Sequence, residues 1–289
     1  MIADILRFRG ELLQRTRAFF VERGFLEVET PLLVRSPGME PHLRAVAAGD
    51  GWLQTSPEYA MKRLLGRGAR RIFQLARCFR EDERGPHHAR EFTMLEWYRA
   101  GEGYEAVMDD CEALLARLAS PERAELLPPF QRLTVAQAFA RFAPGADPAE
   151  LPETEFFRAL IDSVEPRIGR ETPTIVYEWP ARYAALARLK PGQPEVALRF
   201  ELYAGGVELC NAFDELTDAA EQRRRLEVEQ AERRARGLDV YPIDEKFLAD
   251  LARVPSPSAG AALGFDRLAM LLAGATDLRE VVALAGDDV

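Results

Sequence analysis

The segment RIFQLARCFREDERGPHHAREFTMLEWYRA, residues 71–100, predicts the centre of the fold. Residues 71–79 and 92–98 are rich in apolar, aromatic and β-branched residues, a composition typical of β-strands. Between them, Arg80 to Arg90 form a charged connection that contains a glycine and a proline. Two strands joined in this way indicate an antiparallel pair, and long loops in compact domains are usually functional. The segment therefore predicts a strand pair that carries a functional loop.

The segments on either side of this pair alternate between helical and strand patterns. Apolar residues recur at helical spacing in residues 5–21, and helices are also expected at 57–65, where Pro57 suits the first helical position, at 104–119 and at 135–142. A charged helix is expected at residues 218–236, ending at Gly237. Short apolar runs bounded by glycine or proline predict strands at residues 25–30, 200–203 and 207–210. A final unit, residues 258–272, joins a small-residue strand to an apolar helix. Mostly hairpin-like strand order with long helical connections predicts an α+β fold, in which helices flank an antiparallel sheet.

The domain organisation follows from the length and from one proline-rich stretch. With 289 residues and no repeats, the chain is expected to form a single domain. Prolines and glycines recur between about residues 144 and 195, which predicts an inserted, loosely helical subdomain there. Walker A and dinucleotide-binding glycine patterns are absent from the sequence, so any bound ATP has to be held in another way.

Composition narrows the class of protein. The net charge is −9, from 38 basic and 47 acidic residues, which disfavours a large tRNA-binding footprint because phosphate neutralisation dominates such binding. The three cysteines, Cys78, Cys111 and Cys210, lie far apart and predict reduced thiols. No apolar run reaches the roughly 20 residues that span a bilayer. Without a recognisable signal peptide, a cytoplasmic protein is expected.

Three segments carry residues suited to chemistry on ATP. Arg80 follows the first central strand, and its planar, permanently charged guanidinium suits a phosphate. Glu208 and Asn211 interrupt an apolar strand, where a carboxylate is costly unless it meets Mg²⁺ or an ammonium group. Gly264 permits a close backbone approach just before Arg267, which opens a helix. Each segment alone is more simply a solvated loop, a set of edge-strand acids paired with arginines, or a packed turn.

Taken together and in this order, the segments resemble motifs 2 and 3 of the class II aminoacyl-tRNA synthetases. Motif 1 is matched by the strand that ends at Pro31. The stretches TSPEYAMKRL (residues 55–64), EFTMLEWY (91–98) and NAFDELTD (211–218) resemble the lysine branch of that class. Within this branch, the sequence is most similar to the truncated paralogues that ligate β-lysine to elongation factor P. The resemblance covers nearly the whole chain and is weakest at residues 144–195.

The resemblance implies a fold, a reaction and a set of site residues. The fold is the class II catalytic domain without an anticodon-binding OB domain. The reaction joins (R)-β-lysine or lysine to ATP with Mg²⁺, giving an aminoacyl-adenylate that is transferred to a lysine of elongation factor P. Arg80 and Arg267 are the implied catalytic residues. The implied ATP-binding residues are Arg80, Glu81, Asp82, His88, Phe92, Glu208, Leu209, Gly264 and Arg267. The implied substrate-binding residues are Ser56, Glu58, Glu96, Tyr98, Asn211, Glu215 and Ala262, and the implied metal ligands are Glu208 and Glu215.

Several positions depart from the family pattern. Motif 2 usually reads Arg-x-Glu, and here Asp82 is one methylene shorter, so its adenine contact is expected from Glu81, from Glu83 or through water. Ala89 stands where relatives usually have asparagine, which removes a nucleotide contact. Ala212 replaces a frequent glycine and predicts a packing change. None of these departures removes an expected catalytic arginine.

One position separates the two kinds of relative. Ala262 occupies a position that is glycine in lysyl-tRNA synthetases and alanine in the β-lysine ligases. A single methyl changes selectivity by only about 1–3 kcal/mol, so the expected discrimination is modest.

The sequence leaves three functions open. The first is the protein-modifying ligase, and the second is a synthetase that charges tRNA or a tRNA-like acceptor. The third is a catalytically silent paralogue that binds lysine or ATP, which the departures at Asp82 and Ala89 favour. The class forms dimers through motif 1, so a twofold homodimer is expected in each case. The choice between lysine and β-lysine also stays open.

Overall fold

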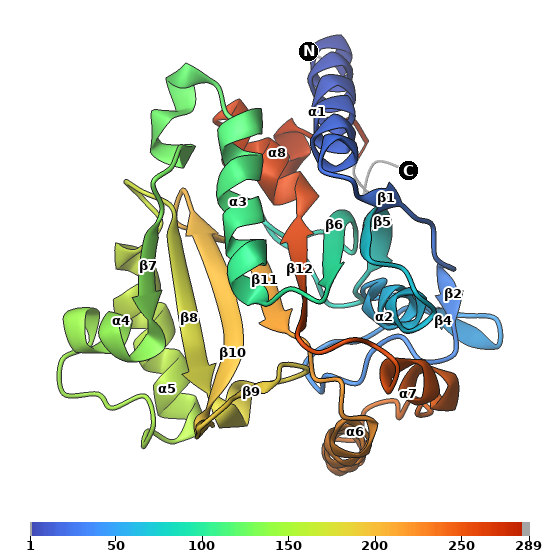
Figure 1. Cartoon of the computed structure of the whole chain (residues 1–289). Coiled ribbons are helices and arrows are strands. Elements are labelled where there is room, and N and C mark those ends of the chain that lie inside the picture. The colour runs from blue at the N-terminus through green and yellow to red at the C-terminus, as the bar shows by residue number, and fades with distance from the viewer. Residues whose placement is uncertain (1, 285–289) are drawn as a thin grey trace. The chain divides into compact units, whose positions relative to one another are not determined.

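A computed structural model describes residues 2–284, and the chain divides into two compact units (Figure 1). Unit 1 contains Met1–Glu102, Leu216–Ser258 and Ala262–Val289. Unit 2 contains Gly103–Glu215 and Ala259–Ala261, so the residues of strand β12 (Ser258–Gly264) are shared between the two units. Within residues 2–284, none of the helices combines the length and apolarity that crossing a bilayer would require.

Strands β5 (Arg71–Phe79) and β6 (Glu91–Ala100) form the centre of unit 1. They pair antiparallel without a register shift, from Arg71 opposite Arg99 to Phe79 opposite Glu91. This arrangement confirms the predicted strand pair and its long connecting loop. Strand β1 (Leu26–Glu27) pairs parallel with β5. Strands β2 (Leu33–Val34), β4 (Gly51–Leu53) and β3 (Ala47–Ala48) form a separate small sheet.

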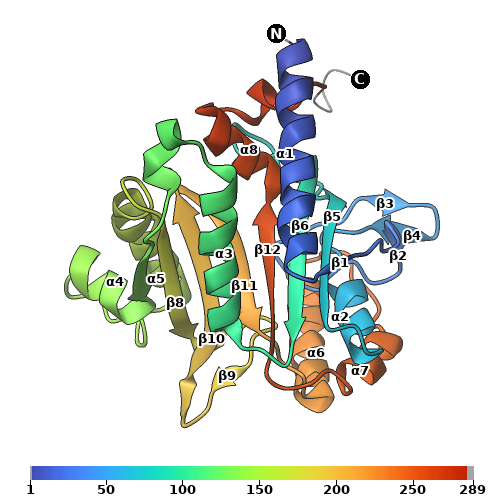
Figure 2. The ribbon, with the colours of Figure 1, turned by 45° about the horizontal axis from the view of Figure 1, so that its top comes forward.

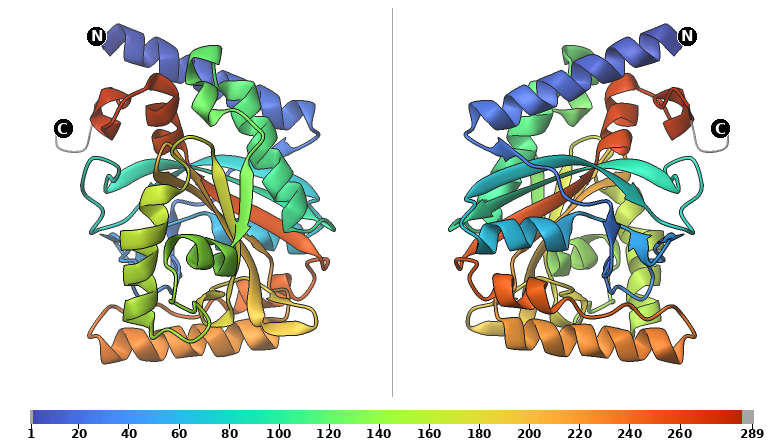
Figure 3. Two further views of the ribbon diagram at one scale, coloured as in Figure 1. Left: turned by 90° about the vertical axis from the view of Figure 1, so that its left-hand side faces the viewer. Right: turned by 90° about the vertical axis from the view of Figure 1, so that its right-hand side faces the viewer.

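Two helices lie on opposite faces of the β5–β6 pair, as both views of Figure 3 show. Helix α1 (Ile2–Glu22) covers one face, where Phe20 stacks on Phe73 with ring centroids 4.8 Å apart and contacts Trp97. Helix α2 (Glu58–Gly66) covers the other face, which carries Ile72 and Tyr98. Because side chains alternate along a strand, odd-numbered residues of β6 face α1 and even-numbered residues face α2.

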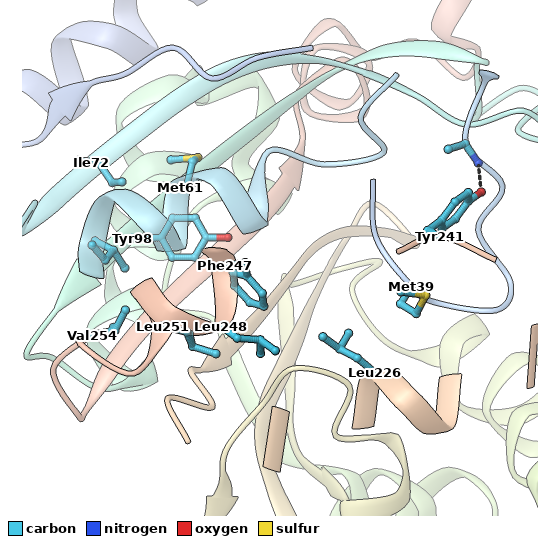
Figure 4. Close-up of a cluster of buried hydrophobic side chains, with 12 residues drawn as sticks. Met39, Met61, Ile72, Tyr98, Leu226, Tyr241, Phe247, Leu248, Leu251 and Val254 are labelled. Atoms are coloured by element: carbon cyan, nitrogen blue, oxygen red, sulfur yellow. Dashed lines mark hydrogen bonds between the residues drawn. The ribbon is translucent and has the colours of Figure 1, made fainter. Parts of the chain in front are cut away.

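A single apolar cluster holds α2 in place (Figure 4). It packs Met61 and Leu65 of α2 against side chains from β5, β6, α6 (Ala219–Ala235) and α7 (Glu245–Leu251). The remaining helices of unit 1 are α8 (Phe265–Ala273) and the 3₁₀ turn η5 (Leu278–Glu280). Helices α6 and α7 contribute Leu226, Phe247, Leu248 and Leu251 to the cluster. Tyr98 belongs both to this core and to the face of β6 described below.

Unit 2 is built on strands β11 (Val207–Asp214), β10 (Gln193–Ala204), β8 (Thr174–Pro180) and β7 (Gln131–Thr134), in that order. Strand β9 (Leu189–Lys190) pairs with β10. The β7–β8 ladder is parallel and the other ladders are antiparallel. The fold is thus α+β as predicted, with a sheet that is mostly antiparallel but contains parallel pairs.

The helices of unit 2 match two of the predicted ranges closely. Helix α3 spans Tyr104–Leu118 and helix α4 spans Val135–Phe142. Helix α4 begins at a capping box, in which the Thr134 side chain accepts from the Gln137 N–H. Helix α5 spans Glu153–Ala159, and the short turns are η1 (Pro121–Leu126), η2 (Leu160–Val164), η3 (Glu165–Arg167) and η4 (Ala181–Tyr183). Residues 144–195 thus contain α5 and also the whole of β8.

The contact between α2 and α7 requires a glycine. A Cβ atom on Gly66 would lie 2.0 Å from the Asp250 carbonyl oxygen, so the two backbones touch where no side chain fits. Arg63 of α2 and Arg67, the residue that follows α2, both donate to the Asp250 carboxylate at 3.0 and 3.1 Å. The position of α2, and of the side chains on its inner face, therefore depends on Gly66.

We expect Gly66→Ala to lower the free energy of unfolding by about 1–3 kcal/mol, because the added methyl overpacks a backbone contact. Gly10→Ala is the matched control: Gly10 is an interior residue of α1, and a Cβ there would meet nothing within 4 Å. Since alanine favours helix over glycine by about 1 kcal/mol, this variant should be unchanged or more stable. Urea unfolding followed by circular dichroism measures both. Equal stability of the two variants would contradict the close contact.

Candidate active site

Arg80 leaves the end of β5 with its guanidinium partly buried, at 23% side-chain exposure. Nη1 lies 3.6 Å from Glu83 Oε1, and the guanidinium carbon lies 5.1 Å from the centre of the Phe92 ring. Among the residues that the structure describes, none accepts a hydrogen bond from the buried Nε–H of Arg80. A buried donor without a partner is costly, so this edge of the guanidinium is suited to an anionic ligand.

Arg267 reaches the same loop from the first turn of α8. Its Nε donates to the His87 carbonyl at 3.1 Å, and its Nη2 lies 2.6 Å from His88 Nε2. His88 Nε2 also lies 3.4 Å from Glu83 Oε2. Through Glu83 and His88 the structure therefore brings Arg80 and Arg267 together, although they are far apart in sequence. Arg80 contacts Glu83 directly, and Arg267 contacts the His88 ring that lies beside the same carboxylate.

Two other predicted ATP-binding residues are held differently. Arg90 Nη2 donates to Glu81 at 2.6 Å, and Arg44 Nη1 donates to both oxygens of Asp82 at 3.0 and 3.3 Å. The Asp82 side chain is 60% exposed. Both carboxylates are thus directed to arginines other than Arg80 and Arg267. The structure shows no direct link between these acids and the paired guanidiniums among the described contacts.

Small residues surround the start of α8. A Cβ on Gly264 would lie 3.3 Å from Arg267 Cδ, so a side chain here would crowd the arginine. Ala262 packs against a small apolar cluster on β5 and β6 that contains Ala76, Cys78 and Met94. Burial and the neighbouring Glu96 charge raise the pKa of the Cys78 thiol, so it stays protonated and acts as a packing group.

A second group of predicted residues meets on the α2 face of β6. Glu96 is fully buried, and its two oxygens accept from Ser56 Oγ at 2.5 Å and from the Tyr98 hydroxyl at 3.0 Å. Ser56 Oγ in turn accepts from the Glu58 N–H at 3.0 Å. Ser56, Glu58, Glu96 and Tyr98 therefore form one cluster, here called the carboxylate slot. The structure brings these four predicted positions together.

Burial controls the charge of the carboxylate slot. Burial, together with the nearby Glu58 charge, raises the pKa of Glu96 to about 8, against the lowering effect of the two hydroxyl donors and Lys62. Burial also raises the pKa of Glu58, against the attraction of Lys62. Glu96 therefore holds a proton at neutral pH unless a cation enters the slot and stabilises the carboxylate.

Two residues of this region were not among the site residues predicted from the sequence. Lys62, only 1% exposed, donates to Glu58 Oε1 at 2.5 Å, one helical turn along α2. Its spacing of four residues from Glu58 on a predicted helix was the available signal. Glu40 is the second such residue, and its carboxylate lies near the side chain of Thr55. A Cβ atom placed on Gly38 would lie 2.8 Å from Glu40 Oε2 and 3.1 Å from Thr55 Oγ1. No local pattern signals this approach of a loop carboxylate to the residue before Ser56.

In unit 2, a β-bulge determines which residues of β11 share a face. Glu201 pairs with Asn211, but Tyr203 pairs with Glu208, so Leu209 is an extra residue in β11. Glu208 and Asn211 are three apart, and in a regular strand they would point to opposite faces. The bulge places both on the face that carries Glu201 and Tyr203.

Asn211 is held by a buried polar network. Arg199 Nε donates to its Oδ1 at 3.3 Å, and Arg199 Nη2 donates to Glu201 at 2.5 Å. The Tyr203 hydroxyl donates to the other oxygen of Glu201 at 2.6 Å. Because Oδ1 is engaged, the Asn211 Nδ2 group is left to donate to an acceptor.

The remaining predicted residues of unit 2 are buried. Leu209 is 2% exposed and Glu215, directly after β11, is 1% exposed. Across residues 2–284, no group of three or more histidine, cysteine, aspartate or glutamate side chains is arranged to hold a metal ion. A metal on Glu208 and Glu215 would thus depend on further ligands from elsewhere.

Comparison with known proteins places these features in a family. Residues 1–287 match the family described as tRNA synthetases class II (D, K and N). The chain is 41% identical, over 312 aligned positions, to proteins named elongation factor P–(R)-β-lysine ligase from Salmonella dublin, Salmonella paratyphi B and Salmonella heidelberg. These alignments cover 99% of the chain and 96% of each relative. The chain therefore belongs to the class II tRNA synthetase family of the D, K and N type.

Proposed function

We propose that the chain is an ATP-dependent ligase that activates (R)-β-lysine, or lysine, and transfers it to a lysine side chain of elongation factor P. The names of the similar proteins support the acceptor and the β-amino acid. The observation that carries the proposal is the carboxylate slot on the same strand pair that presents Arg80 and, through the loop, Arg267.

The spacing along β6 suits a substrate with a cationic end and an anionic end. Glu96 and Phe92 are four residues apart, so they share a face and their Cα atoms are separated by about 13 Å. Glu96 marks the end that accepts an ammonium group, and the Phe92 ring lies beside Arg80. A diamine carboxylate bound between them presents its carboxylate toward the guanidiniums.

The proposed first step is adenylate formation. A carboxylate oxygen of the amino acid attacks the α-phosphorus of ATP, and the bond to the pyrophosphate oxygen breaks. Arg80 binds the α-phosphate and the attacking carboxylate, and Arg267 with His88 binds the terminal phosphate. Fixed cations at these positions stabilise charge that develops in the transition state. Glu83 has to release Arg80 when the phosphates bind.

The proposed second step transfers the aminoacyl group. The acceptor lysine ε-amine attacks the acyl carbon, AMP leaves, and an amide bond forms. Glu208 and Glu215 would hold Mg²⁺, since their carboxylate oxygens are the ligand type it prefers and ATP phosphates can complete its shell. The ion would neutralise phosphate charge. Asn211, with Nδ2 left to donate, suits the substrate carboxylate.

The wider organisation rests on the family resemblance. We propose a single cytoplasmic catalytic domain over residues 1–289, with an inserted subdomain at about 144–195. We also propose a twofold homodimer formed through motif 1 and no stable tRNA complex. Exposed apolar side chains near Pro31 support the dimer: Leu26, Leu32 and Leu33 are 66%, 43% and 51% exposed.

Incubation of the enzyme with ATP, Mg²⁺ and elongation factor P tests the acceptor. With (R)-β-lysine, we expect intact-protein mass spectrometry to show one added aminoacyl group, located by peptide mapping on a lysine side chain. Parallel reactions with α-lysine report the isomer preference. Lysylated tRNA with unmodified elongation factor P would support a tRNA-charging enzyme instead.

Arg80→Ala should lower lysine-dependent ATP–pyrophosphate exchange by about 10²–10³-fold, the typical loss when one charge-stabilising group is removed. Arg77→Ala is the matched control. Arg77 lies three residues earlier on β5, on the α1 face, and is 53% exposed beside Glu91. Its exchange rate should stay within about twofold of wild type. Equal losses in both variants would contradict the assignment of Arg80.

The KM for the amino acid should fall as pH rises from about 6.5 to 8.5. In the empty slot Glu96 has a pKa raised to about 8, so at lower pH the carboxyl must lose a proton before it can pair with an ammonium group. Above that pKa the carboxylate is already charged and binding is tighter. Glu96→Gln should raise KM and flatten this pH dependence in the exchange assay. An unchanged slope in the variant would show that another group titrates.

A further inference from the structure

Arg9 of helix α1 makes a buried ion pair with Asp266, the second residue of helix α8. Its Nη2 lies 2.5 Å from Asp266 Oδ1 and also donates to Thr93 Oγ1 at 3.0 Å. The two side chains are 13% and 7% exposed. Figure 2 shows the N-terminal half of α1 beside α8. The pair thus joins segments that are more than 80 residues apart in sequence.

Asp266 also fixes the backbone of β6. Its second oxygen, Oδ2, accepts from the Thr93 N–H at 2.7 Å. One carboxylate therefore holds the beginning of α8 to the beginning of β6, and Arg9 neutralises that carboxylate. A buried carboxylate that loses its cation is strongly destabilised, so the Asp266–Thr93 link depends on Arg9.

This link joins the residue before Arg267 to the residue after Phe92, which contacts Arg80. Asp266 precedes Arg267 in the chain, and Thr93 follows Phe92, whose ring lies 5.1 Å from the Arg80 guanidinium. Thr93 is an odd-numbered residue of β6 and faces α1, whereas Phe92 and Met94 point to the opposite face. Arg9 acts from behind the strand and touches neither arginine.

We infer that Arg9 is a positioning residue for nucleotide binding. By holding Asp266 to Thr93, it sets the separation of Arg267 from Arg80, and hence the geometry in which both guanidiniums meet one triphosphate. This inference rests on the proposed function, because it requires that the two arginines bind ATP. Displacements of about 1 Å in such groups cost large factors in rate or affinity.

The rest of α1 gives the helix an anchor that is independent of Arg9. Leu12, Thr16, Phe19 and Phe20 are buried, and the aromatic rings pack on β5 and β6. A variant at residue 9 keeps these contacts, so α1 stays docked. On the same helix, Arg17 pairs with Glu27 at 2.9 Å, with both side chains more than a third exposed. Arg17→Met is therefore the matched control for Arg9→Met.

The test measures ATP binding by isothermal titration calorimetry without amino acid, together with both KM values in the exchange assay. For Arg9→Met we expect about tenfold weaker ATP binding and a similar rise in the KM for ATP, with the KM for lysine within about twofold of wild type. Arg17→Met should match wild type in all three. Guanidinium chloride at a few tens of millimolar should partly restore ATP binding to Arg9→Ala, because the ion can occupy the vacated site.

Other outcomes separate the two levels of the proposal. If Arg9→Met melts at a lower temperature but binds ATP as wild type does, Arg9 is only structural and the inference is overturned. If the wild-type protein itself binds no ATP, the proposed function fails, and the inference fails with it.

Discussion

The two-residue period of strand β6 is the constraint on which the rest of unit 1 depends. Its odd-numbered side chains pack on α1, and Trp97 meets Phe20 there. Its even-numbered side chains face α2, where Glu96 and Tyr98 form the carboxylate slot. Successive residues of β6 thus alternate between a face that packs on a helix and a face that carries the carboxylate slot. A shift of register by one residue would exchange the two faces completely.

Much of the fold could be predicted because its elements obey simple periods. The β5–β6 pair, α3 and α4 follow local apolar patterns that tertiary contacts reinforce, whereas α6 is marked by its charged sequence between Asp218 and Gly237. Ser56, Glu58, Glu96 and Tyr98 could be grouped because the family motifs that contain them are contiguous and specific. Arg80 and Arg267 could be grouped for the same reason, and their contacts with Glu83 and His88 follow from where β5 ends and α8 begins.

Features that depend on a partner from a distant segment could not be predicted. The bulge in β11 arises from pairing with β10, so nothing within residues 207–214 indicates it. Arg44, 38 residues away in sequence, donates a hydrogen bond to the Asp82 carboxylate. This contact turns Asp82 toward Arg44 and not toward the expected position of the adenine. The Arg9–Asp266 pair joins opposite ends of the chain. Each is a long-range electrostatic or register effect, and local propensity carries no information about it.

The extra residue in β11 interrupts the ladder with β10 but places Glu208 and Asn211 on one face of the sheet. Pairing Leu209 with Tyr203 would give β10 and β11 an uninterrupted ladder, a register that backbone hydrogen bonding alone would favour. In that register Glu208 would lie opposite Ala204, on the other face of the sheet from Asn211. Glu208, Asn211 and Glu215 are three and four residues apart, a spacing typical of one helix face. In a strand, only a β-bulge can place Glu208 and Asn211 on one face. A smoother sheet would therefore still form, but it would separate side chains that are proposed to bind Mg²⁺ and the substrate.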